Sequence, residues 1–414
     1  MKVIVAHPTA NSNVRASIKG FAEKNILQNF YTSIAVFEGS TLESFSKIKY
    51  FNELKRREFD NSLKPYVKQR PWTELGRQLS KKFNFPSLTL HEQGKFCTDA
   101  VYRDMDSYLS NELNKVNVED TRAVYLYEDG ALSTFLRSKD IGLKCIFDAP
   151  LGYWRSARRL LASEVTNRPE WVSTLTGFKD STAKLKRKDL ELSLADHIIV
   201  ASSFTKETLK EFPGQLSPIS VIPYGFPPIN KSKIYKNLIN RPLNILFVGG
   251  LSQRKGIANL FEAVGYFGDK VNLTVVGGKP VNDCNALNDA LSKHKWIPSI
   301  AHHEVLDLMR EHDVFIFPSL FEGFGLVITE SMSQGTPVIT TERTAGPDII
   351  NNNESGWIVE AGSTTSLITA IDEILSNPNI LKRVGMAAME KAYSRPWHMY
   401  GDELADKVFE LIKD

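Results

Sequence analysis

The stretch Phe321-Glu322-Gly323-Phe324-Gly325-Leu326-Val327-Ile328-Thr329-Glu330 is the most informative part of this 414-residue chain. An apolar run at residues 314–317 precedes it and predicts a short buried strand that Pro318 closes. Residues 326–334 predict a helix that leads into the next strand. A glycine turn between a strand and a helix N-terminus gathers unpaired backbone N–H groups and the positive end of the helix dipole, an arrangement that favours an anion.

Two carboxylates flank this turn. Glu322 lies in the mouth of the turn, and Glu330 lies about one turn inside the predicted helix. At ~1.5 Å per helical residue, the pair would bracket a diphosphate and bind hydroxyl groups on both sides of it. A nucleotide-sugar has this shape, with a ribose, two phosphates and a sugar. The alternative is an ordinary strand-to-helix turn with two exposed glutamates.

The segment resembles the E-x7-E motif of the retaining glycosyltransferases of family 4, which have the two-domain GT-B fold. In that family the first Glu holds a hydroxyl of the donor sugar and the second holds the ribose. The resemblance implies these roles for Glu322 and Glu330. It also implies that the turn between them binds the diphosphate or the sugar through its backbone, at Gly323, Phe324, Gly325 and Leu326.

The length and the composition are those of a globular protein of two domains. The chain is 42% hydrophobic and has a net charge of +3, which does not suggest a nucleic-acid partner. Residues 1–220 hold 33 Lys and Arg against 26 Asp and Glu, whereas the remainder is mildly acidic. This asymmetry indicates an anionic surface or acceptor on the side of the first domain.

Cysteine usage and the first residues predict a cytoplasmic protein. The three cysteines, Cys97, Cys145 and Cys284, are far apart and form no C-x-x-C, which argues against a disulfide framework or a zinc site. The apolar start at residues 3–6 is too short for a signal peptide and predicts a first strand. No stretch approaches the ~18 apolar residues of a membrane span, so we expect any membrane contact to be peripheral, at the inner face.

Short apolar runs alternate with helical patterns along both halves of the chain. The predicted strands are residues 3–6, 34–37, 123–127, 145–147, 197–201, 244–248, 272–276, 314–317, 338–340 and 357–359. Such alternation predicts two Rossmann-like domains with doubly wound parallel sheets. We expect an acceptor-side domain over 1–225 and a nucleotide-sugar-binding domain over 226–395. The last segment, 396–414, has helical spacing, and the resemblance implies that it packs back on the N-terminal domain.

A second turn carries cations where a helix begins. The run Gly249-Gly250-Leu251-Ser252-Gln253-Arg254-Lys255-Gly256 follows a predicted strand and leads into a helix. Cations at a helix N-terminus are unfavourable by ~0.3–1 kcal/mol each unless something compensates them. A bound diphosphate would compensate and would receive charge-assisted hydrogen bonds. A solvated basic loop is the alternative.

This turn resembles the diphosphate-binding loop of the same family, in which Lys255-Gly256 matches the Lys-Gly pair. Many members carry Arg directly after the first Gly, where this chain has Gly250, and we assign the missing charge to Arg254. The resemblance implies catalytic roles for Glu322, Lys255 and Arg254. The chain has no P-loop, and no G-x-G-x-x-G follows the first strand, so neither of these nucleotide motifs applies.

The acceptor or sugar side is expected to come from the N-terminal domain. Family members usually have a glycine-rich loop after the first strand, whereas this chain has polar residues there, so we expect contacts from Asn11, Asn13 or Arg15. His7 either touches substrate or is a hydrogen-bonded structural residue. Relatives also have a sugar-contacting His after a middle strand. This chain has none there, and Asp148 or Tyr153 would take that place.

Two further clusters have alternative interpretations. A basic region with an aromatic residue, at 154–161 and 184–188, would contact anionic lipid or a phosphorylated acceptor, or would be a solvated charged helix. The D-x-D at Asp104 and Asp106 falls in a predicted helix, and the adjacent residues His302 and His303 point apart on a helix. We therefore expect no metal ion and no cofactor.

Taken together, the residues and the resemblance predict a metal-independent, retaining glycosyltransferase. It would move a hexose-type sugar from a nucleoside-diphosphate-sugar to a glycan or lipid-linked acceptor, as in polysaccharide biosynthesis. The alternatives are a nucleotide-sugar epimerase or a glycan phosphorylase of the same fold, or a non-catalytic sugar-nucleotide binder.

Overall fold

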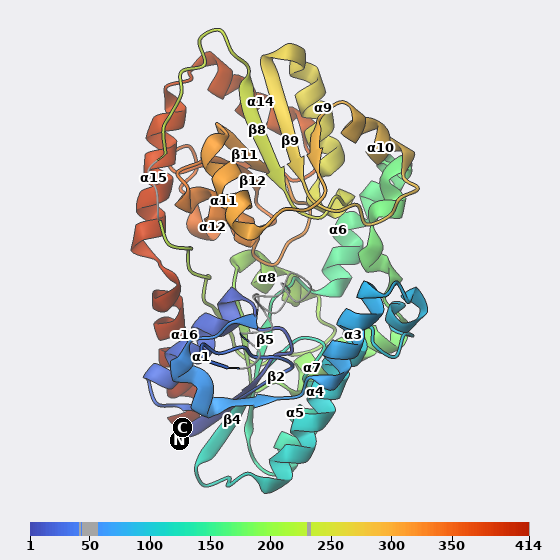
Figure 1. The fold of residues 1–414 in the computed structure, drawn as a ribbon, viewed down its shortest axis with the longest axis vertical. Helices are drawn as coiled ribbons and strands as arrows, with labels where there is room; N and C mark the ends of the chain where they lie inside the picture. The colour runs from blue at the N-terminus through green and yellow to red at the C-terminus, as the bar shows by residue number, and fades with distance from the viewer. Residues whose placement is uncertain (41–42, 44–56, 230–232, 414) are drawn as a thin grey trace.

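The computed structural model describes residues 1–40, 43, 57–229 and 233–413 of the chain. It consists of two α/β units stacked along the long axis of the molecule (Figure 1). Each unit is built around a fully parallel sheet with helices packed against it. Two Rossmann-like units of this kind are the predicted GT-B architecture, and the prediction is confirmed.

The first sheet has the strand order β3-β2-β1-β4-β5-β6-β7. Its central strands are almost continuously buried, as expected for parallel strands covered on both faces. The strands are β1 (Lys2–Ala6), β2 (Leu27–Thr32), β3 (Val67–Gln69), β4 (Thr121–Tyr127), β5 (Lys144–Ala149), β6 (His197–Val200) and β7 (Ile219–Val221).

The second sheet has the order β10-β9-β8-β11-β12-β13. Its strands are β8 (Leu243–Val248), β9 (Val271–Val276), β10 (Lys295–Ile297), β11 (Val314–Phe317), β12 (Val338–Thr341) and β13 (Trp357–Val359). In each sheet the order reverses direction beside the first strand of the unit. In open α/β sheets, ligands bind at this point, outside the carboxyl ends of the strands.

The helices cover the faces of the two sheets (Figure 1). In the first unit they are α1 (Ser12–Glu23), α3 (Trp72–Lys82), α4 (Thr98–Glu112), α5 (Leu132–Asp140), α6 (Trp154–Asn167), α7 (Thr182–Leu194) and α8 (Ser203–Thr208). In the second they are α9 (Ile257–Phe267), α10 (Asn285–Ser292), α11 (His302–Glu311), α12 (Leu326–Ser333), α13 (Gly346–Ile349), α14 (Thr364–Ser376) and α15 (Ile380–Ser394). None of the helices described here has the length and hydropathy needed to cross a bilayer.

The final helix, α16 (Trp397–Lys413), leaves the second unit and packs on α1 of the first. The two helices touch at a pair of glycines, because a Cβ at Gly20 would lie 2.3 Å from the carbonyl oxygen of Gly401. Beside this crossing, the hydroxyls of Ser17 and Tyr400 lie 3.3 Å apart. The predicted return of the last helix to the N-terminal unit is therefore confirmed.

Nine of the ten predicted strands are present, and one is wrong. Residues 34–37 were expected to be a strand, but the strand is β2, directly before them. The apolar side chains of Ile34 and Val36 are buried against Leu75 instead. An apolar run shows that a segment is buried, and pairing with β1 then decides which residues form the strand.

Candidate active site

Two strand-to-helix turns of the second unit meet where it faces the first unit. Residues 318–325 connect β11 to α12, and residues 249–256 connect β8 to α9. The turns touch at Gly256, which has a φ of +67° and whose added Cβ would lie 2.0 Å from the carbonyl oxygen of Pro318. A side chain is excluded here both by the left-handed backbone and by the contact. This approach brings the two predicted binding turns together.

The charged side chains of the two turns converge on Glu322, which is only 7% exposed. Its Oε2 is in direct contact with the Nζ of Lys255 and lies 3.4 Å from Nη1 of Arg254. Nη1 of Arg254 also donates to the carbonyl oxygen of Phe321, 2.7 Å away. Both cations predicted for the diphosphate therefore lie against the first glutamate of the motif.

This cluster is largely removed from water, which strengthens its electrostatic interactions. Burial, followed by the positive charge of Arg254, lowers the pKa of Lys255, and burial lowers the pKa of Arg254. The carboxylate of Glu322 opposes both effects because it favours the charged cations. The ammonium of Lys255 also lies 4.8 Å from the centre of the Phe317 ring, a cation–π contact.

The N-terminus of helix α12 points toward the cluster of charged side chains around Glu322. Its N-cap is Gly325, with a φ of +87°, and no side chain caps the first N–H groups. The N–H of Ile328 bonds to the carbonyl oxygen of Gly325, and the N–H groups before it remain available to an anion. On the other turn, a Cβ at Gly250 would meet nothing within 4 Å, so the backbone borders open space there, whereas a Cβ at Gly249 would contact the rings of Phe247 and Phe317.

Glu330 lies within α12, as predicted, and its side chain is 18% exposed. Its Oε1 lies 2.9 Å from Nε2 of His302, the first residue of α11. His302 was considered in the sequence only as a metal ligand, and its contact with Glu330 was missed. No local signal could have revealed it, because the two residues come from different helices.

His7, at the end of β1, is a buried structural residue in this structure. Its Nδ1 accepts hydrogen bonds from the backbone N–H groups of Thr9 and Ala10, at 3.1 and 2.9 Å. Burial, with a smaller effect of the Arg57 charge, lowers the pKa of His7 to about 3. The ring is therefore neutral at pH 7 and holds the turn that follows β1.

The two asparagines after β1 have different environments. Asn13 is buried in α1, and its Nδ2 donates to the hydroxyl of Tyr224, 3.2 Å away in the segment that joins the units. Asn11 is exposed at the N-terminus of α1 and makes no capping hydrogen bond with its side chain. Of the two, Asn11 is the one accessible to a ligand, and its predicted role stays a prediction.

Asp148 and Tyr153 lie at the end of β5 and at the start of α6. Asp148 is 1% exposed and accepts a 2.6 Å hydrogen bond from the Tyr125 hydroxyl. Burial raises the pKa of Asp148 to about 7. The Tyr153 hydroxyl donates to Asp189, 2.7 Å away. Both residues are engaged within the first unit, and their predicted contact with the sugar stays a prediction.

The first unit contacts the turn between β11 and α12 at Gly323. The carbonyl oxygen of Gly323 accepts hydrogen bonds from the hydroxyls of Ser202 and Thr205, both buried where β6 runs into α8. From the other side, a Cβ at Gly323 would lie 1.9 Å from the carbonyl oxygen of Pro150. These contacts between the units were missed in the sequence, where Ser202 is recognisable only as a helix cap.

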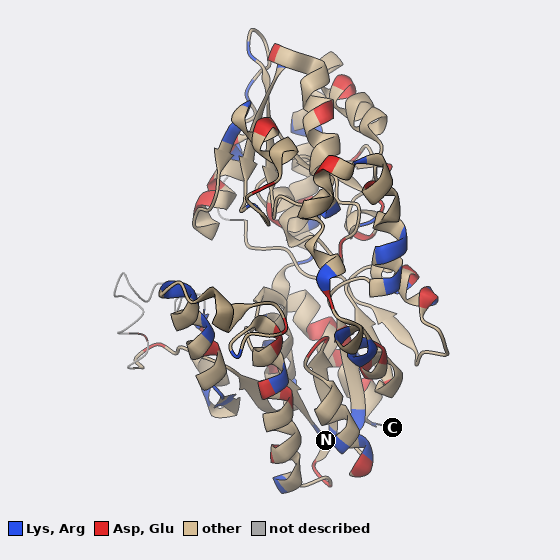
Figure 2. Ribbon diagram, turned by 90° about the vertical axis from the view of Figure 1, so that its right-hand side faces the viewer, with Lys and Arg blue, Asp and Glu red and all other residues tan. Residues whose placement is uncertain are grey.

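The basic residues predicted to contact an anionic surface are mostly paired with acids. Figure 2 shows Lys and Arg beside Asp and Glu over the helices of the lower, N-terminal unit. The ion pairs are Arg155–Asp189, Arg159–Glu211, Lys184–Asp180, Arg187–Asp99 and Lys188–Glu128. This arrangement matches the alternative interpretation, a charged and internally compensated helix surface.

The residues considered for a metal ion have other partners. Asp104 accepts from Arg70 and Thr73, and Asp106 accepts from two backbone N–H groups, all within the first unit. Among the described residues, one group is close enough to share a metal, namely His91, Glu92 and Asp180. It belongs to neither of the two binding turns.

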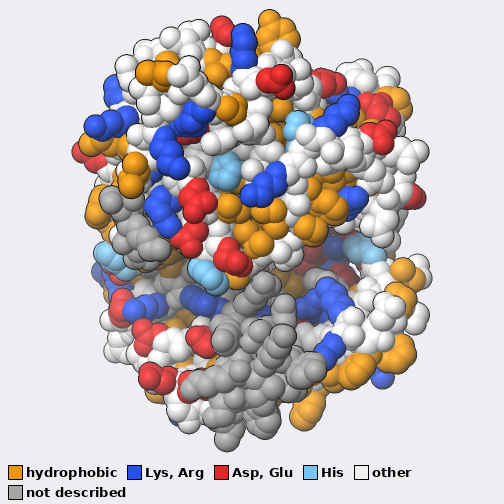
Figure 3. Space-filling model, turned by 45° about the horizontal axis from the view of Figure 1, so that its top comes forward, with side chains coloured by type: hydrophobic (Ala, Val, Ile, Leu, Met, Phe, Trp, Pro, Cys, Tyr) orange, Lys and Arg blue, Asp and Glu red, His pale blue; other side chains and the backbone are white. Residues whose placement is uncertain are grey.

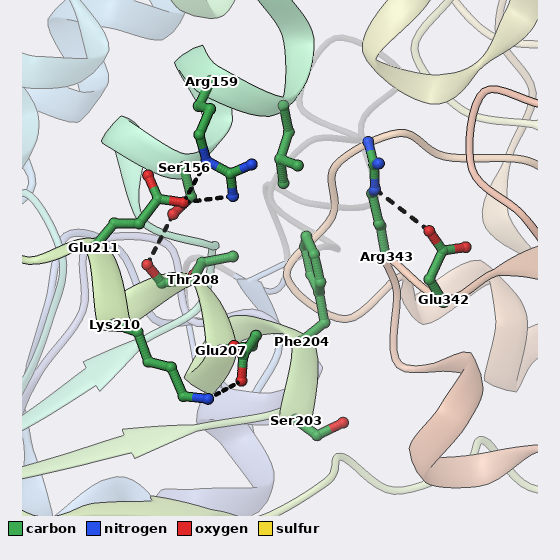
Figure 4. Close-up of a pocket in the computed structure, with 11 residues that line it drawn as sticks. Ser156, Arg159, Ser203, Phe204, Glu207, Thr208, Lys210, Glu211, Glu342 and Arg343 are labelled. Carbon is green, nitrogen blue, oxygen red and sulfur yellow. Dashed lines mark hydrogen bonds and ion pairs between the residues drawn. The ribbon is translucent and has the colours of Figure 1, made fainter.

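A cavity of about 500 Å³ lies between the two units, beside the turn of residues 318–325. Its walls come from α6, α8 and the loop after β12 (Figure 4). The three cations that line it are paired with acids in the same wall: Arg159 with Glu211, Lys210 with Glu207 and Arg343 with Glu342. The lining is therefore charge-compensated, unlike the cluster around Lys255, where two cations share one carboxylate.

Solved structures define the class of this fold. Over its whole length the chain superposes on sucrose-phosphate synthase from Thermosynechococcus elongatus, with a TM-score of 0.67 at 14% identity and 99% of that chain covered. Anabaena HepE in complex with UDP and glucose gives a TM-score of 0.62 at 14% identity, over 99% of this chain and 100% of that one. These likenesses confirm a GT-B fold.

The sequence comparisons find similarity to known glycosyltransferases, including a family match within the second unit. Residues 230–391, which hold both binding turns, match the family model of the glycosyl transferases group 1. CapM, a capsular polysaccharide biosynthesis glycosyltransferase of Staphylococcus aureus, is 25% identical over 252 residues, 54% of this chain and 66% of CapM. The UDP-Gal:alpha-D-GlcNAc-diphosphoundecaprenol alpha-1,3-galactosyltransferase of Escherichia coli is 27% identical over 267 residues, 54% of this chain and 69% of the relative. The chain thus spans about two thirds of the length of these curated relatives.

Proposed function

We propose that the protein is a retaining glycosyltransferase that moves a hexose-type sugar from a nucleoside-diphosphate-sugar to a hydroxyl of a glycan or lipid-linked acceptor. The observation that carries this proposal is the convergence of Arg254, Lys255 and Glu322 beside the N-terminus of α12. Two cations and unpaired N–H groups suit a diphosphate, and Glu322 and Glu330 suit hydroxyl groups on either side of it.

The chemistry follows from where charge develops. When the bond between the sugar and the diphosphate breaks, negative charge builds on the leaving oxygen. Arg254, Lys255 and the first N–H groups of α12 lie together at this end of the second unit and would stabilise that charge once the diphosphate replaces Glu322 as the partner of the cations. These groups supply the positive charge that a metal ion would otherwise supply, and we therefore propose a metal-independent reaction.

Retention of configuration requires the acceptor to attack from the face that the diphosphate leaves. In the proposed reaction Glu322 orients the donor sugar through a hydroxyl, and the departing phosphate oxygen takes the proton of the acceptor hydroxyl. A bond forms between the acceptor oxygen and the anomeric carbon as the bond to phosphate breaks. The first unit, which touches the donor turn at Gly323, would close over the donor and exclude water.

The acceptor class rests on the relatives. CapM is named for capsular polysaccharide biosynthesis, and the Escherichia coli relative for a diphosphoundecaprenol-linked sugar. We propose an acceptor of the same kind, a glycan or a lipid-linked glycan bound against the first unit. Figure 3 shows a hollow between the two units with Lys and Arg side chains beside it, which suits an acceptor that carries phosphate.

A lipid-linked acceptor would bring the protein to a membrane, and one surface suits this contact better than the paired basic helices. The segment from α3 to residue 90 exposes large apolar side chains, Trp72, Leu79, Phe83, Phe85 and Leu90. Exposed Lys81 and Lys82 lie between them in sequence. Aromatic residues beside lysines favour the interface of an anionic bilayer.

Sedimentation with vesicles tests this surface. We expect the protein to bind phosphatidylglycerol vesicles more strongly than phosphatidylcholine vesicles, and Phe83→Ser with Phe85→Ser to reduce binding at least fivefold. Tyr266→Ser, which removes an equally exposed aromatic from the second unit, should leave binding unchanged. Equal binding by the double variant and wild type would contradict the assignment of this surface.

The donor test uses thermal unfolding with UDP, GDP and ADP and then with their sugars. One nucleotide should stabilise the wild-type protein and not Glu330→Ala. Transfer is then measured as nucleotide release with added glycan acceptors, with and without EDTA, and the anomeric configuration of the product by NMR. An epimerase would convert the donor without an acceptor, a phosphorylase would require inorganic phosphate, and a non-catalytic binder would bind the donor without turnover.

A further inference from the structure

A hydrogen bond between His302 and Glu330 connects α11 to the predicted ribose-binding carboxylate. Nε2 of His302 lies 2.9 Å from Oε1 of Glu330. An ionised carboxylate only accepts hydrogen bonds, so Nε2 carries the proton in this contact. The imidazole is 64% exposed, whereas Glu330 is 18% exposed, so the contact lies at the mouth of the site.

The hydrogen bond from His302 uses one carboxylate oxygen of Glu330, Oε1, and does not involve the other oxygen, Oε2. Within the described part of the chain, Oε2 of Glu330 has no hydrogen-bond donor of its own. A glutamate side chain has three rotatable bonds and loses conformational freedom when a ligand fixes it. A hydrogen bond that holds Oε1 before the ligand arrives reduces that loss and fixes the direction in which Oε2 points.

We propose that His302 is a positioning residue for nucleotide recognition, which holds the Glu330 carboxylate so that its second oxygen faces the ribose hydroxyls. This inference rests on the proposed function, since it assigns Glu330 to the ribose. His302 itself need not touch the nucleotide. The effect of His302 on binding passes through Glu330, so it is confined to ligands that carry ribose hydroxyls.

The adjacent histidine provides a matched control. His303 follows His302 in the same helix and is also exposed. Successive side chains of a helix point about 100° apart, so only one of the two faces α12. Among the described residues, His303 makes no hydrogen bond or ion pair. Both variants remove an exposed imidazole from the first turn of α11, and they differ in the contact with Glu330.

The experiment measures binding by titration calorimetry for UDP, GDP, ADP and their 2′,3′-dideoxy counterparts. We expect His302→Ala to weaken binding of the nucleotide that binds wild type about five- to tenfold, the size of one ordinary intramolecular hydrogen bond. His303→Ala should bind as wild type does. His302→Gln, whose amide N–H reaches toward Glu330, should recover part of the loss.

The dideoxynucleotide and a double variant separate positioning from direct contact. The dideoxynucleotide should bind wild type weakly and be insensitive to His302→Ala, and His302→Ala should have no further effect in the Glu330→Ala background. A loss with His302→Ala that persists for the dideoxynucleotide would overturn the inference, because His302 would then touch the base or the phosphates. Equal binding by His302→Ala and His303→Ala would overturn it and leave the proposed function standing. No nucleotide binding by wild type would remove the proposed function and the inference together.

Discussion

The ammonium of Lys255 lies directly against the carboxylate of Glu322, although the two residues come from different turns of the second unit. The charged groups of the two turns therefore compensate each other. A nucleotide-sugar would exchange these partners, with phosphate oxygens taking the ammonium and a sugar hydroxyl donating to the carboxylate. Such an exchange avoids a stage at which either charge is buried alone, which would cost several kcal/mol.

Lys255→Ala tests this relationship. The change removes a preorganised cation from the leaving group, so we expect turnover to fall by ~10²-fold or more. It also leaves Glu322 buried with Arg254 as its remaining partner, and we expect the free energy of unfolding to fall by about 3 kcal/mol. Turnover is followed by nucleotide release and stability by denaturant unfolding.

Two variants make this prediction specific. Adding Glu322→Gln to Lys255→Ala leaves Arg254 without its carboxylate partner, so stability should not recover and turnover should stay low. Lys270→Ala, which removes an exposed lysine from the same unit, should change neither quantity. Wild-type turnover in Lys255→Ala would contradict the catalytic assignment.

Gly323→Ala tests the close approach of the two units. An alanine Cβ would lie 1.9 Å from the carbonyl oxygen of Pro150, so one of the two loops must move. We expect turnover to fall at least tenfold and the melting temperature to fall as well. Gly265→Ala is the matched control, because a Cβ there meets nothing within 4 Å. Unchanged turnover and melting temperature in Gly323→Ala would show that the approach is not required.

Ser202 and Thr205 provide a second test of the same junction. Ser202→Ala with Thr205→Val removes both hydroxyls that donate to Gly323 and leaves a buried carbonyl unpaired. We expect a loss of ~1–3 kcal/mol in the free energy of unfolding, and a lower turnover because the donor turn loses its support from the first unit. Ser193→Ala, at an exposed serine on α7, should be neutral. A fully stable double variant would argue against the junction.

Asp148→Asn tests the buried carboxyl at the end of β5. The folded pKa of about 7 lies above the ordinary aspartate pKa of 3.8, so the folded protein binds more protons than the unfolded chain between these pH values. Stability contributed by this group is present below about pH 4 and is lost as the pH rises to 7, a change of roughly 4 kcal/mol. We expect the asparagine variant to be more stable than wild type at pH 8.

The measurement compares melting temperatures of the two proteins from pH 5 to pH 8.5. The comparison is needed because His7 changes stability in the opposite direction. Its pKa is lowered to about 3, so its contribution to the stability of the folded state rises with pH up to about 6.5. The difference between wild type and variant isolates Asp148. Asp140→Asn, at an exposed residue, is the control. Parallel pH profiles for Asp148→Asn and wild type would contradict the raised pKa.

Much of the site could be predicted because its signals are local. The glycine turn before α12 and the Lys-Gly pair before α9 are short motifs whose neighbouring strands show as apolar runs. Their elements formed as predicted, with α12 over Leu326–Ser333 and β11 over Val314–Phe317. The strand predicted at residues 34–37 was wrong because an apolar run shows only burial, and strand pairing depends on contacts outside the run.

The sequence by itself determined the parallel α/β class, the two binding turns and the helices that follow them, since backbone propensity, turn chemistry and hydrophobic period act within a few residues. Only the tertiary structure decided that Lys255 contacts Glu322, that His302 contacts Glu330 and that Ser202 and Thr205 hold Gly323. These partners lie far apart in the chain. They meet because parallel strands bring their carboxyl ends to one edge of each sheet, and because the two units then pack with those edges facing each other.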